Sequence, residues 1–111
     1  MDMKLYRPTG LNELRLVYQS GMKHWPPRFP EQSIFYPVLE RCYAQQIARD
    51  WNTKSDTYAG FVAEFEIEDA YINKFEKHIV GSSQHVELWI PAEELKRFNN
   101  NIISLNVPLN G

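Results

Sequence analysis

One acidic residue stands out in the stretch from Gly81 to Pro91. Turn-forming residues at 81–83 lead into an apolar run at 88–90, which Pro91 ends. This pattern predicts a turn followed by a short strand, with Glu87 at the mouth of the strand. Burying a carboxylate is costly, so a protein that places one here is expected to use it. Glu87 is therefore a candidate functional acid. The alternative is an outward-facing residue of an edge strand.

The other reactive side chains have spacings that favour structural roles. The three histidines are scattered and there is no pair of thiols, so we predict no metal site. The only cysteine, Cys42, lies within a helical pattern, where a small buried thiol is the usual interpretation. Ser82 and Ser83 lie near His85, but adjacency in sequence does not produce the geometry of a hydrolase triad.

The composition bounds the class of protein. The chain has 111 residues with 43% hydrophobic residues, which predicts one domain over residues 1–111 with a modest core. A net charge of −2 gives no basic excess for nucleic-acid binding, and no window predicts a membrane span. A single cysteine favours a reducing compartment, so we expect a cytoplasmic protein.

The first half of the chain predicts two strands, each followed by a helix. Lys4–Arg7 predicts a strand that Pro8 ends, and Thr9 can cap a helix that Gly21 stops. Ser33–Tyr36 predicts a second strand, and Pro37 stands where a second helix would begin. The apolar stripe that we expect this helix to bury consists of Leu39, Tyr43, Ile47 and Trp51.

The second half is richer in strands. Tyr58–Ile67 alternates apolar and acidic residues, which predicts a strand with one solvated face rather than a metal site. Asp69 can cap a short helical turn, and His78–Val80 predicts a brief strand. Residues 91–98 predict a helix and residues 102–107 a last strand. The order predicts an α+β domain of short, mainly antiparallel strands with two or three helices.

The segment Trp25–Pro30 contains three prolines, which forbid a helix and favour an extended loop. Such a loop could bind a proline-recognising partner. The preferred interpretation is that Trp25 and Phe29 fix the loop onto the domain's own core.

The order of these motifs resembles the mono-ADP-ribosyltransferases. That family carries an Arg or His on a first strand, a Ser or Tyr motif on a second, and a catalytic Glu at the head of a later strand. Glu87–Pro91 matches the end of the family's last motif. The chain also resembles small uncharacterised bacterial proteins described in ADP-ribosylation terms, in the blocks Phe35–Leu39, Ile47–Asn52 and Ser83–Trp89.

The resemblance implies an ADP-ribosyltransferase-like fold and NAD as the substrate. Glu87 would be catalytic and would stabilise the oxocarbenium-like ribose that forms as nicotinamide leaves. Arg7, Tyr36 and His85 would bind the cofactor, with Arg7 on the pyrophosphate and Tyr36 stacked on nicotinamide. His85 replaces the Glu or Gln that positions the acceptor in many members, and the family's Ser-Thr-Ser motif is absent here.

Two functions follow from the sequence. The first is NAD binding with ADP-ribosyl transfer, for instance to a protein acceptor, or NAD cleavage. The second is a non-catalytic domain of the same fold that binds a nucleotide-like ligand, or a protein partner through Trp25–Pro30. The transfer function requires Arg7, Tyr36 and Glu87 to line one concavity, and this requirement distinguishes the two.

Overall fold

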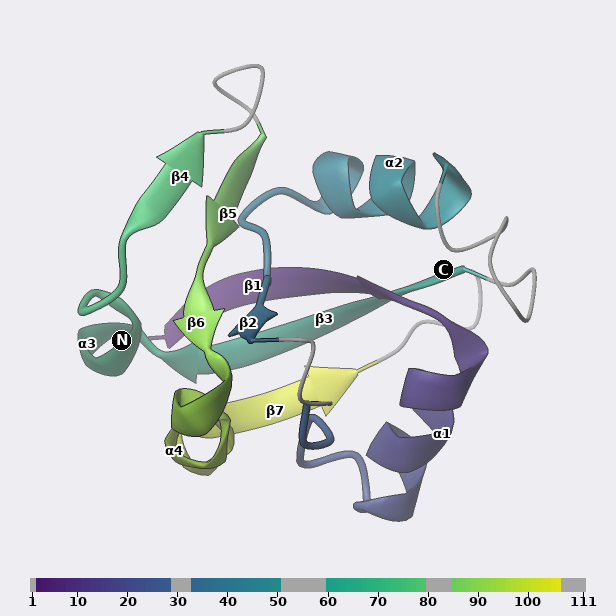
Figure 1. Ribbon diagram of the computed structural model, residues 1–111, viewed down its shortest axis with the longest axis horizontal. Coiled ribbons are helices and arrows are strands. Elements are labelled where there is room, and N and C mark those ends of the chain that lie inside the picture. The colour runs from purple at the N-terminus through teal and green to yellow at the C-terminus, as the bar shows by residue number, and fades with distance from the viewer. Residues whose placement is uncertain (1, 29–32, 51–59, 80–84, 107–111) are drawn as a thin grey trace.

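The central sheet consists of β1 (Asp2–Thr9), β3 (Phe61–Glu68) and β7 (Ile102–Asn106), in the antiparallel order β1-β3-β7 (Figure 1). The computed structural model describes residues 2–28, 33–50, 60–79 and 85–106. β1 and β3 pair over their whole lengths. This long pairing fixes which side chains of each strand share a face, because side chains alternate along a strand.

Val38 joins this sheet to a hairpin made of β4 (Lys77–Ile79) and β5 (Val86–Leu88). It forms antiparallel bridges to Tyr6 in β1 and to Glu87 in β5. The Tyr6 and Val38 backbones exchange two hydrogen bonds, of 2.9 and 2.8 Å. The flanking pair β2 (Ile34–Phe35) and β6 (Ile90–Pro91) continues the same register. The three-stranded sheet therefore connects through Val38 to the hairpin.

The larger core lies on one face of this sheet. Trp25 is at its centre, with its ring centroid 5.5 Å from those of both Phe35 and Phe65. α1 (Leu11–Gln19), α3 (Asp69–Ile72) and α4 (Leu95–Asn100) contribute residues to it, and the 3-10 helix η2 (Ala92–Glu94) leads into α4. Its buried members are Leu5, Val17, Trp25, Phe35, Ala63, Phe65, Ile67, Tyr71, Ile72, Leu88, Ile90, Leu95, Phe98 and Leu105.

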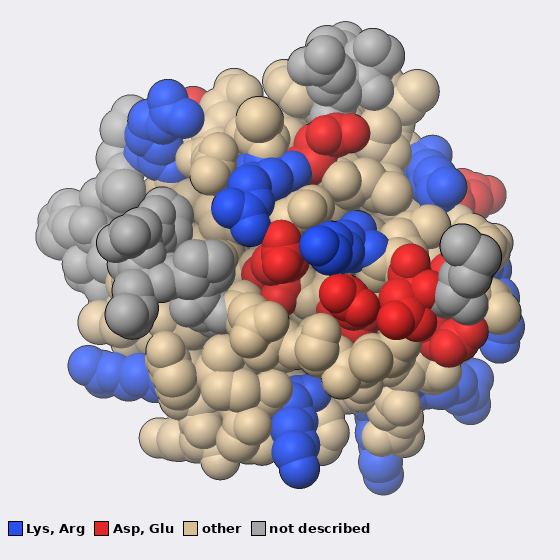
Figure 2. Space-filling view, turned by 180° about the vertical axis from the view of Figure 1, so that it is seen from behind, with Lys and Arg blue, Asp and Glu red and all other residues tan. Residues whose placement is uncertain are grey.

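α2 (Arg41–Asp50) covers part of the opposite face. Its small residues Ala44 and Ala48 are buried against Val38 and Val62. Figure 2, seen from behind, shows acidic and basic side chains interleaved in a band among other residues. The acidic residues of β3, Glu64, Glu66 and Glu68, are half-buried, so the face that the alternating sequence predicted to be solvated is partly covered.

The class of fold is confirmed in its coarse form as a compact α+β domain with antiparallel strands. The described residues form four α-helices, not two or three, because the turn after Asp69 and the segment after Leu95 each complete a helix. Gly21 stops α1 as predicted, with a φ of 80° that favours glycine. The predicted loop 52–57 and the turn 81–83 lie outside the described residues.

Three predictions about proline and capping are wrong. Pro8 does not end β1. The Tyr6 N–H points away from β3, and position 8, two residues further along, faces the same way, so the missing N–H of proline costs little there. Pro37 does not begin a helix, because its carbonyl accepts a hydrogen bond from the Leu88 N–H at 2.9 Å and keeps the segment extended. Thr9 is buried at the end of β1, and Gly10 occupies the N-cap of α1.

The predicted apolar stripe of α2 is only partly correct. Leu39 precedes the helix, and Tyr43 and Ile47 are half-buried, whereas Trp51 lies outside the described residues. The fully buried positions are Ala44 and Ala48, because small side chains let the helix approach the sheet closely.

Candidate functional site

The carboxylate of Glu87 lies on the α2 face of the sheet. Leu88, its neighbour in β5, is fully buried in the larger core, so alternation turns Glu87 to the other side. Tyr6, Val38 and Glu87 oppose one another across the strands and therefore share that face. Glu87, which the sequence predicts at the mouth of a strand, therefore lies beside α2.

Two neutral donors orient the Glu87 carboxylate. The Tyr43 hydroxyl of α2 donates to Oε2 at 2.8 Å, and the Trp89 indole N–H donates to Oε1 at 3.3 Å. Burial, together with this hydrogen bond to Glu87, raises the pKa of Tyr43 to about 12. Across the described part of the chain, no Lys or Arg forms an ion pair with Glu87. Its negative charge is therefore held in place without an ion pair to a Lys or Arg of the described ranges.

Aromatic rings surround this carboxylate. Trp89 stacks on His78 at 3.9 Å between ring centroids, and Tyr43 stacks on His85 at 4.3 Å. Tyr36 meets Trp89 edge to face at 5.9 Å. We call this group the Glu87 cluster; it consists of Glu87, Tyr36, Tyr43, His78, His85 and Trp89. Trp89 and Tyr36 keep 41% and 39% of their surfaces exposed, so the cluster is open to a ligand.

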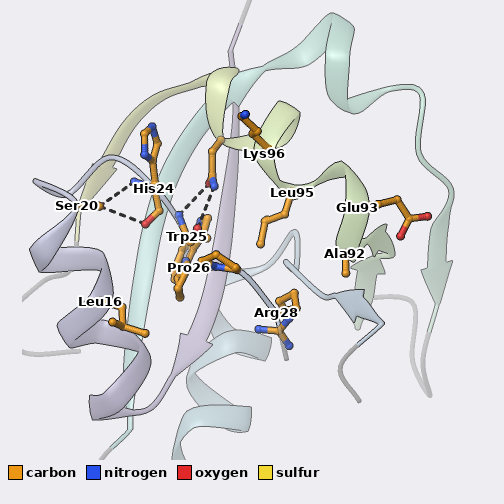
Figure 3. Close-up of a pocket in the computed structure, with 12 residues that line it drawn as sticks. Leu16, Ser20, His24, Trp25, Pro26, Arg28, Ala92, Glu93, Leu95 and Lys96 are labelled. Atoms are coloured by element: carbon orange, nitrogen blue, oxygen red, sulfur yellow. Dashed lines mark hydrogen bonds between the residues drawn. The ribbon is translucent and has the colours of Figure 1, made fainter. Parts of the chain in front are cut away.

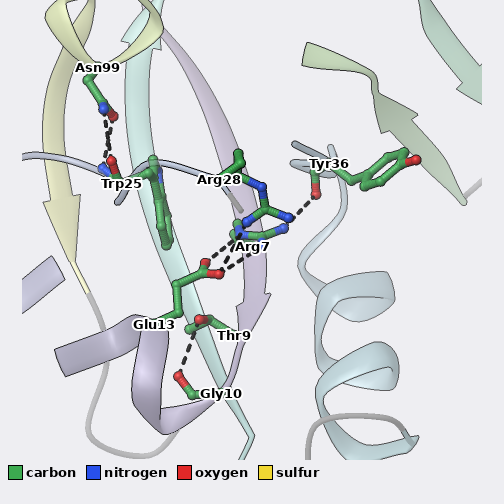
Figure 4. Close-up of polar contacts among 8 residues, drawn as sticks. All are labelled: Arg7, Thr9, Gly10, Glu13, Trp25, Arg28, Tyr36 and Asn99. Carbon is green, nitrogen blue, oxygen red and sulfur yellow. Dashed lines mark hydrogen bonds and ion pairs between the residues drawn. The ribbon is translucent and has the colours of Figure 1, made fainter. Parts of the chain in front are cut away.

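Arg7 lies on the opposite face of the sheet. Its guanidinium carbon is 4.5 Å from the centroid of Phe35, and its Nε and Nη2 atoms donate to the two oxygens of Glu13 at 2.7 and 3.0 Å. It meets Tyr36 only through a 3.4 Å hydrogen bond to the Tyr36 carbonyl. In Figure 4 the Tyr36 ring points away from Arg7.

The structure therefore brings Tyr36 and His85 to Glu87 but not Arg7. The expectation that Arg7, Tyr36 and Glu87 line one concavity is wrong, because Arg7 follows Tyr6 in β1 and alternation reverses its direction. The ion pair between Arg7 and Glu13 is largely buried. Tyr36 is exposed rather than a core residue.

Sequence reasoning missed three members of the cluster. Tyr43 was assigned to a core stripe, Trp89 to an apolar run, and His78 to a strand without a role. One signal was available, since Glu87 and Trp89 are two residues apart in a predicted strand and should share a face. The contacts of Tyr43 and His78 depend on the tertiary arrangement, because both residues are distant from Glu87 in the sequence.

A second concave site lies under the proline-containing loop. As predicted, Trp25 is buried and fixes the loop to the core, whereas Phe29 and Pro30 lie outside the described residues. A pocket of about 780 Å³ adjoins the loop (Figure 3). The residues that line it are Leu16, Ser20, His24, Trp25, Pro26, Pro27, Arg28, Ala92, Glu93, Leu95, Lys96 and Asn99.

Within the described residues, no group of three or more His, Cys, Asp or Glu side chains is arranged to hold a metal ion. No helix in these same ranges is long and apolar enough to cross a membrane. No protein-family model, curated protein or solved structure matches this chain. The geometry of the two sites is therefore the basis for assigning a function.

Proposed function

We propose that this protein is a non-catalytic domain that binds a nucleotide-like ligand at the Glu87 cluster. The cluster would recognise a positively charged aromatic ring of that ligand. NAD is the ligand that the sequence resemblance suggests, and its nicotinamide ring carries such a charge. The observation that supports this proposal is the Glu87 carboxylate, oriented by Tyr43 and Trp89 beside exposed aromatic surface.

The chemistry of the cluster suits a cationic ring. Aromatic faces attract cations through their quadrupole, and a ring can stack or pack edge-on against Trp89 and Tyr36. The carboxylate of Glu87 adds a full negative charge, and its oxygens have lone pairs beyond those that accept from Tyr43 and Trp89. A neutral ring of the same shape would lose the electrostatic part of this attraction.

ADP-ribosyl transfer is less well supported than binding. The transfer function assigned the pyrophosphate to Arg7, whose guanidinium lies on the other face and is paired with Glu13. The described members of the Glu87 cluster include no cationic side chain to replace it, apart from histidines. We therefore assign recognition to the nicotinamide end of the ligand, without turnover.

The test is a calorimetric comparison of NAD with NADH, whose reduced nicotinamide ring is uncharged. We expect NAD to bind about tenfold more tightly, a difference of about 1.4 kcal/mol from cation–π and carboxylate attraction. Glu87→Gln keeps the shape of the side chain but removes its charge, so it should reduce this preference to the part that the aromatic rings supply. Glu64→Gln is the matched control, because Glu64 lies on the same strand face but pairs with Arg41 at 2.8 Å.

Three results would contradict the proposal. Equal affinities for NAD and NADH would show that ring charge is not recognised, and no binding of either would exclude the ligand class. Nicotinamide released by the unaltered protein, and lost in Glu87→Gln, would instead support the transferase function.

A further inference from the structure

We propose that the pocket beneath the loop at residues 24–28 binds an apolar ligand that carries a single carboxylate, with Arg28 as its charged contact. This site is separate from the Glu87 cluster and does not depend on the function proposed there.

The first step concerns a charge imbalance behind the pocket. Arg7, Arg28 and Glu13 form a compact group with two positive charges and one negative (Figure 4). Glu13 gives both oxygens to short hydrogen bonds from Arg7, whereas the Arg28 Nη1 is 3.5 Å from Glu13 Oε2. Among the described residues, Glu13 therefore mainly neutralises Arg7, which leaves about one positive charge in this group to be balanced.

The second step concerns burial. Only 10% of the Arg28 side chain is exposed, and its Nε–H is buried without a hydrogen-bond partner. The Trp25 Nε1–H, which belongs to another residue of the pocket wall, is also buried and unpartnered. Unpaired buried donors are rare because each costs about 1–3 kcal/mol. Burial, and then the charge of Arg7, lower the pKa of Arg28, while the Glu13 carboxylate acts in the opposite direction.

The third step concerns the shape and lining of the pocket. Its volume of about 780 Å³ falls within the range of small-molecule sites. Leu16 of α1 and Leu95 of α4 lie on either side of Trp25 in Figure 3, and Pro26 and Ala92 add further apolar surface. A ligand with an apolar body would fill this space and bring an anionic end to Arg28.

The wall of the pocket is held rigidly in place. The Trp25 N–H donates to Asn99 Oδ1 and the Asn99 Nδ2 donates to the Trp25 carbonyl, each at 2.9 Å. These bonds join the loop to α4, so the pocket is preorganised and binding needs little ordering of the chain. His24, Lys96 and Glu93 are exposed on the rim, where water screens their charges.

A carboxylate fits this site better than a phosphate. The excess of one positive charge matches a monoanion, and the unpaired Arg28 Nε–H is a donor from which a carboxylate oxygen can accept. A phosphate monoester, with about two negative charges, would leave a net negative charge in the pocket.

The experiment compares decanoate with decanol, which has the same chain length but no charge, by following the indole N–H resonances in ¹⁵N-labelled protein. Trp25→Phe assigns the Trp25 resonance. We expect decanoate to shift this resonance and to bind at least about tenfold more tightly than decanol, as a charge-assisted hydrogen bond predicts.

Variants locate the charge. Arg28→Met should weaken decanoate about tenfold and leave decanol unchanged, whereas the rim control Lys96→Met should change decanoate less than about threefold. If Arg28→Met does not fold, the comparison of decanoate with decanol on the unaltered protein decides the question. Equal binding of the two ligands, no binding of decanoate, or tighter binding of decyl phosphate would overturn the proposal. None of these results depends on NAD, so the two proposals fail independently.

Discussion

At the scale of the residue, two carboxylates of this protein have opposite environments. Glu13 is paired with Arg7 and lies near Arg28, whereas Glu87 accepts hydrogen bonds from a tyrosine and a tryptophan. A carboxylate held by arginine contributes to stability, since its charge is already compensated. A carboxylate held by neutral donors keeps its charge for a ligand. This difference is why we assign a structural role to Glu13 and a binding role to Glu87.

Glu13→Gln should lower the free energy of unfolding by roughly 1–3 kcal/mol, because it leaves the largely buried Arg7 guanidinium without its anionic partner. Urea unfolding monitored by circular dichroism measures this change. Glu64→Gln is the control, because it breaks the more exposed pair with Arg41 and should cost less than about 1 kcal/mol. Equal costs for the two variants would contradict the structural role of Glu13.

The same ion pair should make stability depend on pH in acid. Burial alone would raise the pKa of Glu13, but the charge and hydrogen bonds of Arg7 hold it below its ordinary value of 4.5. A lowered pKa in the folded state means that the stabilisation is present above pH 4.5 and is lost as pH falls through the folded-state pKa. Urea unfolding between about pH 3 and 6 should therefore show a shallower acid loss in Glu13→Gln than in the unaltered protein.

At the scale of the element, α2 controls how the Glu87 cluster is built. Ala44 and Ala48 allow the helix to approach Val38 and Val62, and this approach brings the Tyr43 hydroxyl within 2.8 Å of Glu87. The helix thus acts as a positioning element for the carboxylate, although none of its residues was expected at the site.

Ala44→Leu should cost roughly 1–3 kcal/mol of stability, because extra methylenes do not fit in a fully buried position. By moving the helix away from the sheet, it should also weaken the hydrogen bond between Tyr43 and Glu87. The pKa of Tyr43 should then fall from about 12 toward its ordinary value of 10. Measurement uses urea unfolding and the ¹³Cζ chemical shift of tyrosine between about pH 9 and 13.

The control for this prediction is Gln46→Leu, an exposed position of the same helix, which should change stability by less than about 0.5 kcal/mol. An Ala44→Leu protein with unchanged stability and an unchanged Tyr43 titration would show that α2 does not set the distance to Glu87.

At the scale of the whole molecule, Val38 is the connection between two parts of the sheet. It exchanges two hydrogen bonds with Tyr6, while its neighbours Pro37 and Leu39 bond to β5. Through these contacts the hairpin that carries Glu87 is held beside β1. The cluster and the loop pocket consequently lie on opposite sides of one continuous arrangement of strands.

Val38→Pro removes the N–H that donates to the Tyr6 carbonyl at 2.8 Å. The orphaned carbonyl and the lost pairing should cost roughly 1–3 kcal/mol. Hydrogen exchange should accelerate at Tyr6 and Leu88 and remain slow at the β1–β3 pairing, for instance at Leu5. Lys4→Pro is the control. The Lys4 N–H points away from β3, as the Tyr6 N–H does, but Lys4 does not take part in the bridge to Val38. Equal acceleration in both variants would argue against a connecting role for Val38.

Much of the local structure was predictable from the sequence alone, because short-range periodicity and turn chemistry determine it. The alternation at 61–67 predicted β3, Gly21 marked the end of α1, and the turn of helix after Asp69 was expected. The burial of Trp25 was also predicted, since a large aromatic in a polyproline-like loop gains most by packing onto the core.

Only the tertiary structure decided which side chains share a site. The order of Arg7, Tyr36 and Glu87 along the chain was compatible with one concavity, but order does not specify the face of a strand. Register does, and the register of β1 with Val38 places Tyr6 rather than Arg7 on the side of Glu87. Because side chains alternate with a period of two, a difference of one residue moves a side chain from one face of the sheet to the other.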